Sequence, residues 1–96
     1  MATRCGQIDP GVLLYLIARE GLGASALSDL LYKRSGLAGL SGTSGDMREI
    51  EAAGTRAAAE ALDYFAYRCR REIAAMCASL GGLDALVFSA GIGEHA

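Results

Sequence analysis

The sequence has few of the residues that build metal sites or disulfides. Among its 96 residues are one histidine, His95, and three cysteines, Cys5, Cys69 and Cys77, with no Cys-x-x-Cys pair. Because His95 has no cysteine or second histidine at ligand spacing, we expect no metal site in this chain. Cys69 and Cys77 would lie about 12 Å apart along one helix face, too far for a disulfide. The odd number of cysteines therefore predicts free thiols in a reducing cytosol.

The sequence also lacks concentrated positive charge and a long hydrophobic run. Nine Lys and Arg residues against eleven Asp and Glu residues give a net charge of −2. This balance gives no electrostatic reason to expect nucleic acid or an anionic membrane as a partner. The longest basic run, Arg68 to Arg71, falls on an expected helix that also carries acids, and we interpret it as a solvated face. No segment has the pattern of a signal peptide or the length of a transmembrane helix.

What the sequence does have is a high apolar content for its length. Hydrophobic residues make up 52% and charged residues 21% of a chain long enough for one domain at most. A soluble chain this short has a high surface-to-volume ratio and a small core. One explanation of this composition is a chain that packs against further protein.

Local signals predict two helices and a glycine-rich loop in the first half. Asp9-Pro10 is a helix-start signal, and the helix that it opens should end at Gly21 to Gly23. Ser25 can cap a second helix that ends near Gly36. The stretch 36–45 is rich in glycine and predicts a loop with at most a short extended piece.

The second half contains the strongest periodic pattern. Asp46 can cap a short helix over 47–52. Apolar residues then recur at steps of three and four over 58–80, between a cap at Thr55 and a stop at Gly81-Gly82, which predicts one long helix. Residues 85–88 predict a buried strand, which would need neighbouring strands to form a sheet.

Three stretches have compositions that packing alone does not demand. Residues 3–9 place an arginine before a helix, where it can meet an anion or simply remain on the surface. Residues 41–48 form a glycine-rich lead into a helix, which can hold a phosphate or polar ring or can be an ordinary cap. Residues 89–93 form a Gly-x-Gly turn that either approaches a ligand or joins a strand to a helix. No complete GxGxxG, HExxH, GxSxG or P-loop motif occurs.

Taken together and in this order, TRCGQIDPG (3–11), LSGTSGDMREIE (40–51) and GGLDALVFSAGIGE (81–94) resemble the acetate kinase family. The resemblance covers essentially the whole chain and corresponds to part of the family's C-terminal half. It implies an α/β fold of the duplicated ribonuclease-H-like type found in sugar kinases and actin. Residues 1–96 would be a partial C-terminal, nucleotide-binding domain, mostly helical with one core strand near 85–90. The family's N-terminal domain and extreme C-terminus are expected outside this sequence.

The resemblance also implies an activity. The family transfers the γ-phosphoryl group of ATP to acetate reversibly, giving acetyl phosphate and ADP with Mg²⁺, as a cytoplasmic homodimer. Its groups for phosphate, acetate and Mg²⁺ fall outside this chain, so we expect the isolated chain to be inactive. One alternative is a propionate or other short-chain carboxylate kinase, which shares these motifs. Another is a non-catalytic remnant that binds nucleotide weakly or associates with a partner.

The resemblance assigns roles residue by residue. Arg4 matches the arginine that stabilises charge on the transferring phosphoryl group. The residues that match nucleotide-binding motifs are Asp46, Met47, Arg48, Gly91, Ile92, Gly93 and Glu94. The first three match a triplet that lines the adenosine pocket, and the other four match a turn against the adenosine and ribose. Two positions depart from the family pattern: Gln7 stands where Asp is usual, and His95 stands where the family has Asn. Because His can also hydrogen-bond a polar group, though with a different geometry from Asn, His95 is a further candidate nucleotide contact.

Overall fold

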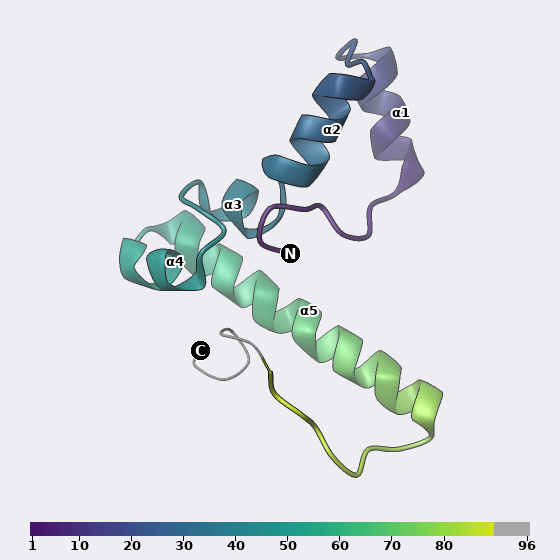
Figure 1. Ribbon diagram of the computed structural model, residues 1–96, viewed down its shortest axis with the longest axis vertical. Coiled ribbons are helices and arrows are strands. Elements are labelled where there is room, and N and C mark those ends of the chain that lie inside the picture. The colour runs from purple at the N-terminus through teal and green to yellow at the C-terminus, as the bar shows by residue number, and fades with distance from the viewer. Residues whose placement is uncertain (90–96) are drawn as a thin grey trace.

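The computed structural model describes residues 1–89, which form five α-helices (Figure 1). The helices are α1 (Pro10–Ala18), α2 (Ala24–Lys33), α3 (Gly36–Ser41), α4 (Met47–Ala53) and α5 (Arg56–Leu80). Helices α1 and α2 form a hairpin at one end of the molecule, while α3 and α4 pack on the first half of the long helix α5. The prediction of a mostly helical chain is confirmed.

Three helices begin at the caps that the sequence predicts. Asp9, Asp46 and Thr55 each accept a hydrogen bond from a backbone N–H of the helix that follows, at 2.9, 2.9 and 3.1 Å. These N–H groups have no partner inside the helix, so the caps stabilise its first turn. The fourth predicted cap is wrong, because Gly23 is the N-cap of α2 and Ser25 lies within that helix.

Residues 1–5 cross the C-terminal end of α2 and the N-terminal end of α3 (Figure 1). Five hydrogen bonds of 2.8–2.9 Å hold them there. These bonds run from Cys5 N–H to the Leu31 carbonyl, from Thr3 Oγ1 to the Tyr32 carbonyl, from Ser35 N–H to the Thr3 carbonyl, from Leu37 N–H to the Met1 carbonyl and from Ala38 N–H to the Ala2 carbonyl. The segment therefore satisfies backbone groups that the two helix ends leave unpaired.

The glycine-rich stretch 36–45 differs from its prediction, because its first half forms helix α3 rather than a loop. Two of its glycines make room for the N-terminal segment. A Cβ on Gly36, which has a φ of +63°, would overlap the Met1 carbonyl oxygen, and a Cβ on Gly45 would lie 2.8 Å from the Ala2 carbonyl oxygen. Glycine at these two positions permits backbone-to-backbone contact and does not mark a break in structure.

The core is small and lies where α3 and α4 meet the first half of α5. Its buried side chains are Leu37, Met47, Ile50, Ala58 and Ala61, with Ala53, Leu62 and Phe65 packed against them. Helix α5 forms as its apolar stripe predicts, but exposure rises along it, from 2% at Ala58 to 59% at Met76 and 73% at Leu80. Its second half thus has an apolar face that the described residues do not cover.

The strand predicted near 85–90 is absent from the part of the chain that the structure describes, and this prediction is wrong for residues 85–89. Val87 and Phe88 are 85% and 64% exposed. A strand needs a neighbour to bond its N–H and C=O groups, and no described segment lies alongside to provide one.

Apolar surface is exposed at both ends of the molecule. Helix α1 contributes no buried residue, and Leu14, Tyr15 and Ile17 are each more than half exposed. The accessible surface of 7035 Å² exceeds the roughly 5200 Å² expected of a compact monomer of this mass. Among the helices described, none combines the length and apolarity needed to cross a bilayer.

The core predicts an asymmetry between two leucines of α3. Leu37 is fully buried and Leu40 is 48% exposed. Leu37→Ala leaves a cavity and should lower the free energy of unfolding by about 2–5 kcal/mol, whereas Leu40→Ala should cost about 1 kcal/mol or less. Urea denaturation followed by circular dichroism measures both values. Equal losses in the two variants would contradict the packing of α3 on α5.

The docking of residues 1–5 predicts a second pair of variants. Gly36 and Gly54 have φ angles of +63° and +66°, but only at Gly36 would a Cβ meet another segment. Both Gly→Ala changes carry about 1–2 kcal/mol of backbone strain. Gly36→Ala should lower the melting temperature further, because it also displaces Met1 from α3. Thermal denaturation compares the two, and an equal decrease would mean that residues 1–5 do not dock.

Candidate functional site

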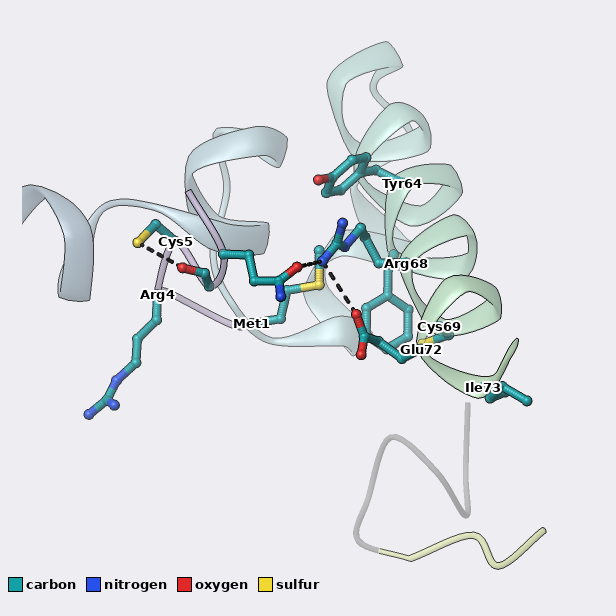
Figure 2. A pocket seen from close by; sticks show the side chains of 11 residues that line it. Met1, Arg4, Cys5, Tyr64, Arg68, Cys69, Glu72 and Ile73 are labelled. Carbon is teal, nitrogen blue, oxygen red and sulfur yellow. Dashed lines mark hydrogen bonds and ion pairs between the residues drawn. The ribbon is translucent and has the colours of Figure 1, made fainter. Parts of the chain in front are cut away.

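Arg4 lies in the middle of the docked segment. Its neighbours Thr3 and Cys5 are bonded to the end of α2, so the backbone of Arg4 is fixed while its side chain is exposed. The guanidinium carbon lies 5.0 Å from the centre of the Tyr32 ring, within cation–π range. Figure 2 shows this guanidinium directed away from the side chains of α5. A planar guanidinium held in this way can offer two parallel donors to an anion.

Asp46 and Arg48 form one charged unit at the start of α4. The Asp46 carboxylate accepts from the Arg48 backbone N–H at 2.9 Å, and its Oδ2 lies 3.2 Å from Arg48 Nη2. Hydrogen bonds from the Arg48 side chain, and then from its backbone N–H, lower the pKa of Asp46 below the ordinary range. The Arg48 side chain is 90% exposed. The pair therefore presents a carboxylate and a guanidinium together on the surface.

The side chain of Met47 points away from those of its two neighbours. Its side chain is 6% exposed and lies in the core beside Leu37 and Ile50. Helical geometry explains the separation, because successive residues of a helix point in different directions. In this structure Met47 anchors α4, while Asp46 and Arg48 face solvent.

Some backbone N–H groups of the loop before α4 donate hydrogen bonds to side chains of the same loop. Thr43 N–H donates to Ser41 Oγ at 3.2 Å, and Asp46 N–H donates to Ser44 Oγ at 3.0 Å. These donors, with the Arg48 N–H that Asp46 caps, already have acceptors. Of the two sequence interpretations of this loop, the local hydrogen bonds favour the ordinary cap over a phosphate cradle.

The N-terminal segment 1–5 lies against the second predicted stretch, 41–48. Ala2, two residues before Arg4, packs against Gly45, the residue before Asp46. The docked segment 1–5 thus reaches residues 41–48 through Ala2, which lies just before the first predicted stretch, 3–9. The third stretch and the two residues after it hold Gly91, Ile92, Gly93, Glu94 and His95, which lie outside the described residues.

Arg68 lies beside the candidate site, although the sequence did not single it out. A cavity of about 590 Å³ lies between residues 4–7 and α5, and Arg68 is among the residues that line it (Figure 2). Its Nη2 donates to Gln7 Oε1 at 3.1 Å and lies 3.4 Å from Glu72 Oε1. The side chain is 19% exposed, so its interpretation as part of a solvated face is wrong. The spacing of four residues to Glu72 was a signal for that pair, whereas the contact with Gln7 had none.

Metal-binding chemistry is not assembled in the described part of the chain. Among residues 1–89, no three His, Cys, Asp or Glu side chains are grouped as a bound ion would require. Cys5, Cys69 and Cys77 are free thiols.

Comparison with known sequences gives one consistent result. The family model described as the Acetokinase family matches residues 1–96. An acetate kinase of Methylocella silvestris is 56% identical over 95 residues, which are 99% of this chain and 24% of that protein. An acetate kinase of Rhodopseudomonas palustris is 53% identical over 96 residues, which are 100% of this chain and 24% of that protein. The chain spans about a quarter of the length of these curated relatives.

Solved structures give the same result. The crystal structure of Porphyromonas gingivalis acetate kinase matches with a TM-score of 0.93 and 46% identity, over 98% of this chain and 24% of that one. A propionate kinase from Francisella tularensis matches with a TM-score of 0.90 and 38% identity, over 100% of this chain and 26% of that one. The helices thus have the arrangement of a segment of the larger acetate and propionate kinase structures, which is consistent with the ribonuclease-H-like fold expected from the sequence. Because the family model and these relatives cover essentially its whole length, the chain belongs to the acetokinase family.

Proposed function

We propose that this chain supplies one wall of the active site of an acetate kinase, which transfers the γ-phosphoryl group of ATP reversibly to acetate. The observation that carries the proposal is Arg4, an exposed guanidinium on a backbone that five hydrogen bonds fix to the fold. The relatives named as acetate kinases, about half identical over this segment, support the choice of reaction.

The proposed role of Arg4 is to stabilise negative charge on the phosphoryl group during its transfer. Phosphoryl transfer depends mainly on positioning and on electrostatic stabilisation, and a donor fixed in advance avoids reorganisation during the reaction. The contact with the Tyr32 ring supports this role. At an exposed site such a contact contributes about 0.5–1 kcal/mol. The ring can therefore orient the guanidinium and still release it to bond a phosphoryl oxygen.

The proposed nucleotide contacts are Asp46 and Arg48, together with Gly91 to His95. An ionised Asp46 can accept a hydrogen bond from a ribose hydroxyl or an adenine amino group, and Arg48 can stack on a base. Met47 would contribute indirectly, by holding α4 in the core. Mg²⁺, when bound, would neutralise phosphate charge. Residues 1–89 hold no group of three ligands for such an ion. As the family resemblance implies, we expect the ligands of Mg²⁺ outside this chain.

The reaction requires more polypeptide than this chain contains. The exposed apolar faces of α1 and of the second half of α5 support packing against a partner that corresponds to the other three quarters of the relatives. That partner could belong to the same polypeptide or to a separate one. A cytoplasmic homodimer remains our expectation for the assembled enzyme.

Two alternatives remain. The likeness to a propionate kinase structure favours a slightly larger carboxylate as the second candidate substrate. A non-catalytic remnant that binds nucleotide weakly, or only a partner, is the alternative of another class.

The proposal predicts that activity depends on the missing polypeptide. The isolated chain should give no acetyl phosphate from ATP, Mg²⁺ and acetate in a hydroxamate assay. A chimera, in which this chain replaces the matching 95 residues of the M. silvestris enzyme, should give it. A folded but inactive chimera would favour the remnant, and propionate turned over faster than acetate would favour the second substrate.

Arg4 should be the critical charge of this chain in that chimera. Arg4→Ala should lower kcat by about a hundredfold or more, because a fixed donor to the transition state is lost. Arg56→Ala is the matched control, since Arg56 is 93% exposed and pairs with Glu60 on the same helix. Steady-state kinetics compares the two, and equal kcat values would contradict the role of Arg4.

A further inference from the structure

Arg68 lies near the middle of α5 and is more buried than the other arginines that form ion pairs in the described chain. Its side chain is 19% exposed, against 63% for Arg34, 90% for Arg48 and 93% for Arg56. A guanidinium gives up its water only where its donors find acceptors. The contacts of Arg68 therefore indicate what it holds in place.

The two acceptors of Arg68 come from different parts of the chain. Glu72 lies one turn further along α5 and orients the guanidinium by an ion pair of 3.4 Å. Gln7 lies on the segment that carries Arg4, and its Oε1 accepts a hydrogen bond from Arg68 Nη2 at 3.1 Å. The bond thus joins the long helix to the N-terminal segment three residues after Arg4.

The segment between these attachments contains a bend at Gly6. Cys5 is bonded to α2 through its backbone, and Gly6 has a φ of +66°, in a region where glycine has wide conformational freedom. Beyond Gly6, the side chain of Gln7 reaches α5 and Asp9 caps α1. The Gln7–Arg68 bond therefore restrains the bend directly on its far side.

We propose that Arg68 is a positioning residue for Arg4. By holding Gln7 against α5, Arg68 fixes the bend at Gly6, and so it keeps Cys5 docked on α2 and the Arg4 guanidinium beside the Tyr32 ring. The Tyr32 ring on α2 makes the cation–π contact with the Arg4 guanidinium. The use of this position in catalysis rests on the proposed function, whereas the positioning itself does not.

The neutral amide of Gln7 makes the proposal testable by small changes. Gln7→Leu removes the acceptor at similar size and leaves α5 untouched. Gln7→Glu keeps the length of the side chain and supplies a charged acceptor, which forms a shorter and stronger bond to a guanidinium. Arg68→Met removes the donor, and Arg70→Met is a matched control because Arg70 is exposed on the same helix.

The test is NMR on the full chain, 1–96. The Tyr32 ring current should shift the Arg4 side-chain protons upfield, and Tyr32→Leu defines the position without that shift. In Gln7→Leu and in Arg68→Met, we expect most of the ring-current shift to disappear and the order parameters of Gly6 and Gln7 to fall below about 0.6. Gln7→Glu should keep or enlarge the shift, and Arg70→Met should leave it unchanged. The methyl signals of Leu37 and Ile50 report whether the core is intact.

A ring-current shift retained in Gln7→Leu with the core intact would overturn the proposal. So would loss of the shift in Gln7→Glu, because a stronger acceptor should preserve the position. A contact that only adds stability would leave the Arg4 signals in place in every variant whose core remains folded. These measurements involve no turnover, so an inactive chimera would count against the proposed function and not against this inference.

Discussion

Residues 1–5 bond the backbone ends of two helices at once, and most of the remaining structure depends on this arrangement. The last carbonyls of α2 and the first N–H groups of α3 have no partners within their own helices. The N-terminal segment supplies those partners through five short hydrogen bonds. Because these bonds use almost only the main chain, the Arg4 side chain is left exposed while its backbone is fixed. Glycine at positions 36 and 45 follows from the same arrangement, since a side chain there would push the segment away.

The parts of the fold that could be predicted are those with a local physical cause. The side chains of Asp9, Asp46 and Thr55 each bond an N–H two or three residues away, and the stripe of α5 repeats every three or four residues. The parts that could not be predicted depend on distant partners. A six-residue helix such as α3 is not stable alone, and it forms because Leu37 is buried and the N-terminal segment bonds its first turn. The apolar run 85–88 is the opposite case, since it has the composition of a strand but residues 1–89 supply no neighbouring strand.

The same distinction applies to the candidate site. The sequence motifs identified the family and singled out Arg4, Asp46 and Arg48, which the structure places on the surface. They did not show that Met47 belongs to the core, because its direction is set by how α4 packs on α5. Nor did they show the contact between Gln7 and Arg68, whose partners are 61 residues apart. The candidate site therefore combines Arg4, which the motifs single out, with the Gln7–Arg68 contact, which only the folded chain forms.

The central claim is that residues 1–5 and the ends of α2 and α3 form one cooperative unit that fixes the backbone of Arg4. Amide hydrogen exchange measured by NMR on the chain 1–96 tests it most directly, because the amides of Cys5, Ser35, Leu37 and Ala38 each donate one of the bonds involved. The claim predicts that these four amides are protected to a similar degree and exchange together. Exchange of Cys5 and Ser35 at the rate of an unstructured peptide, while the amide of Ile50 in α4 stays protected, would contradict it.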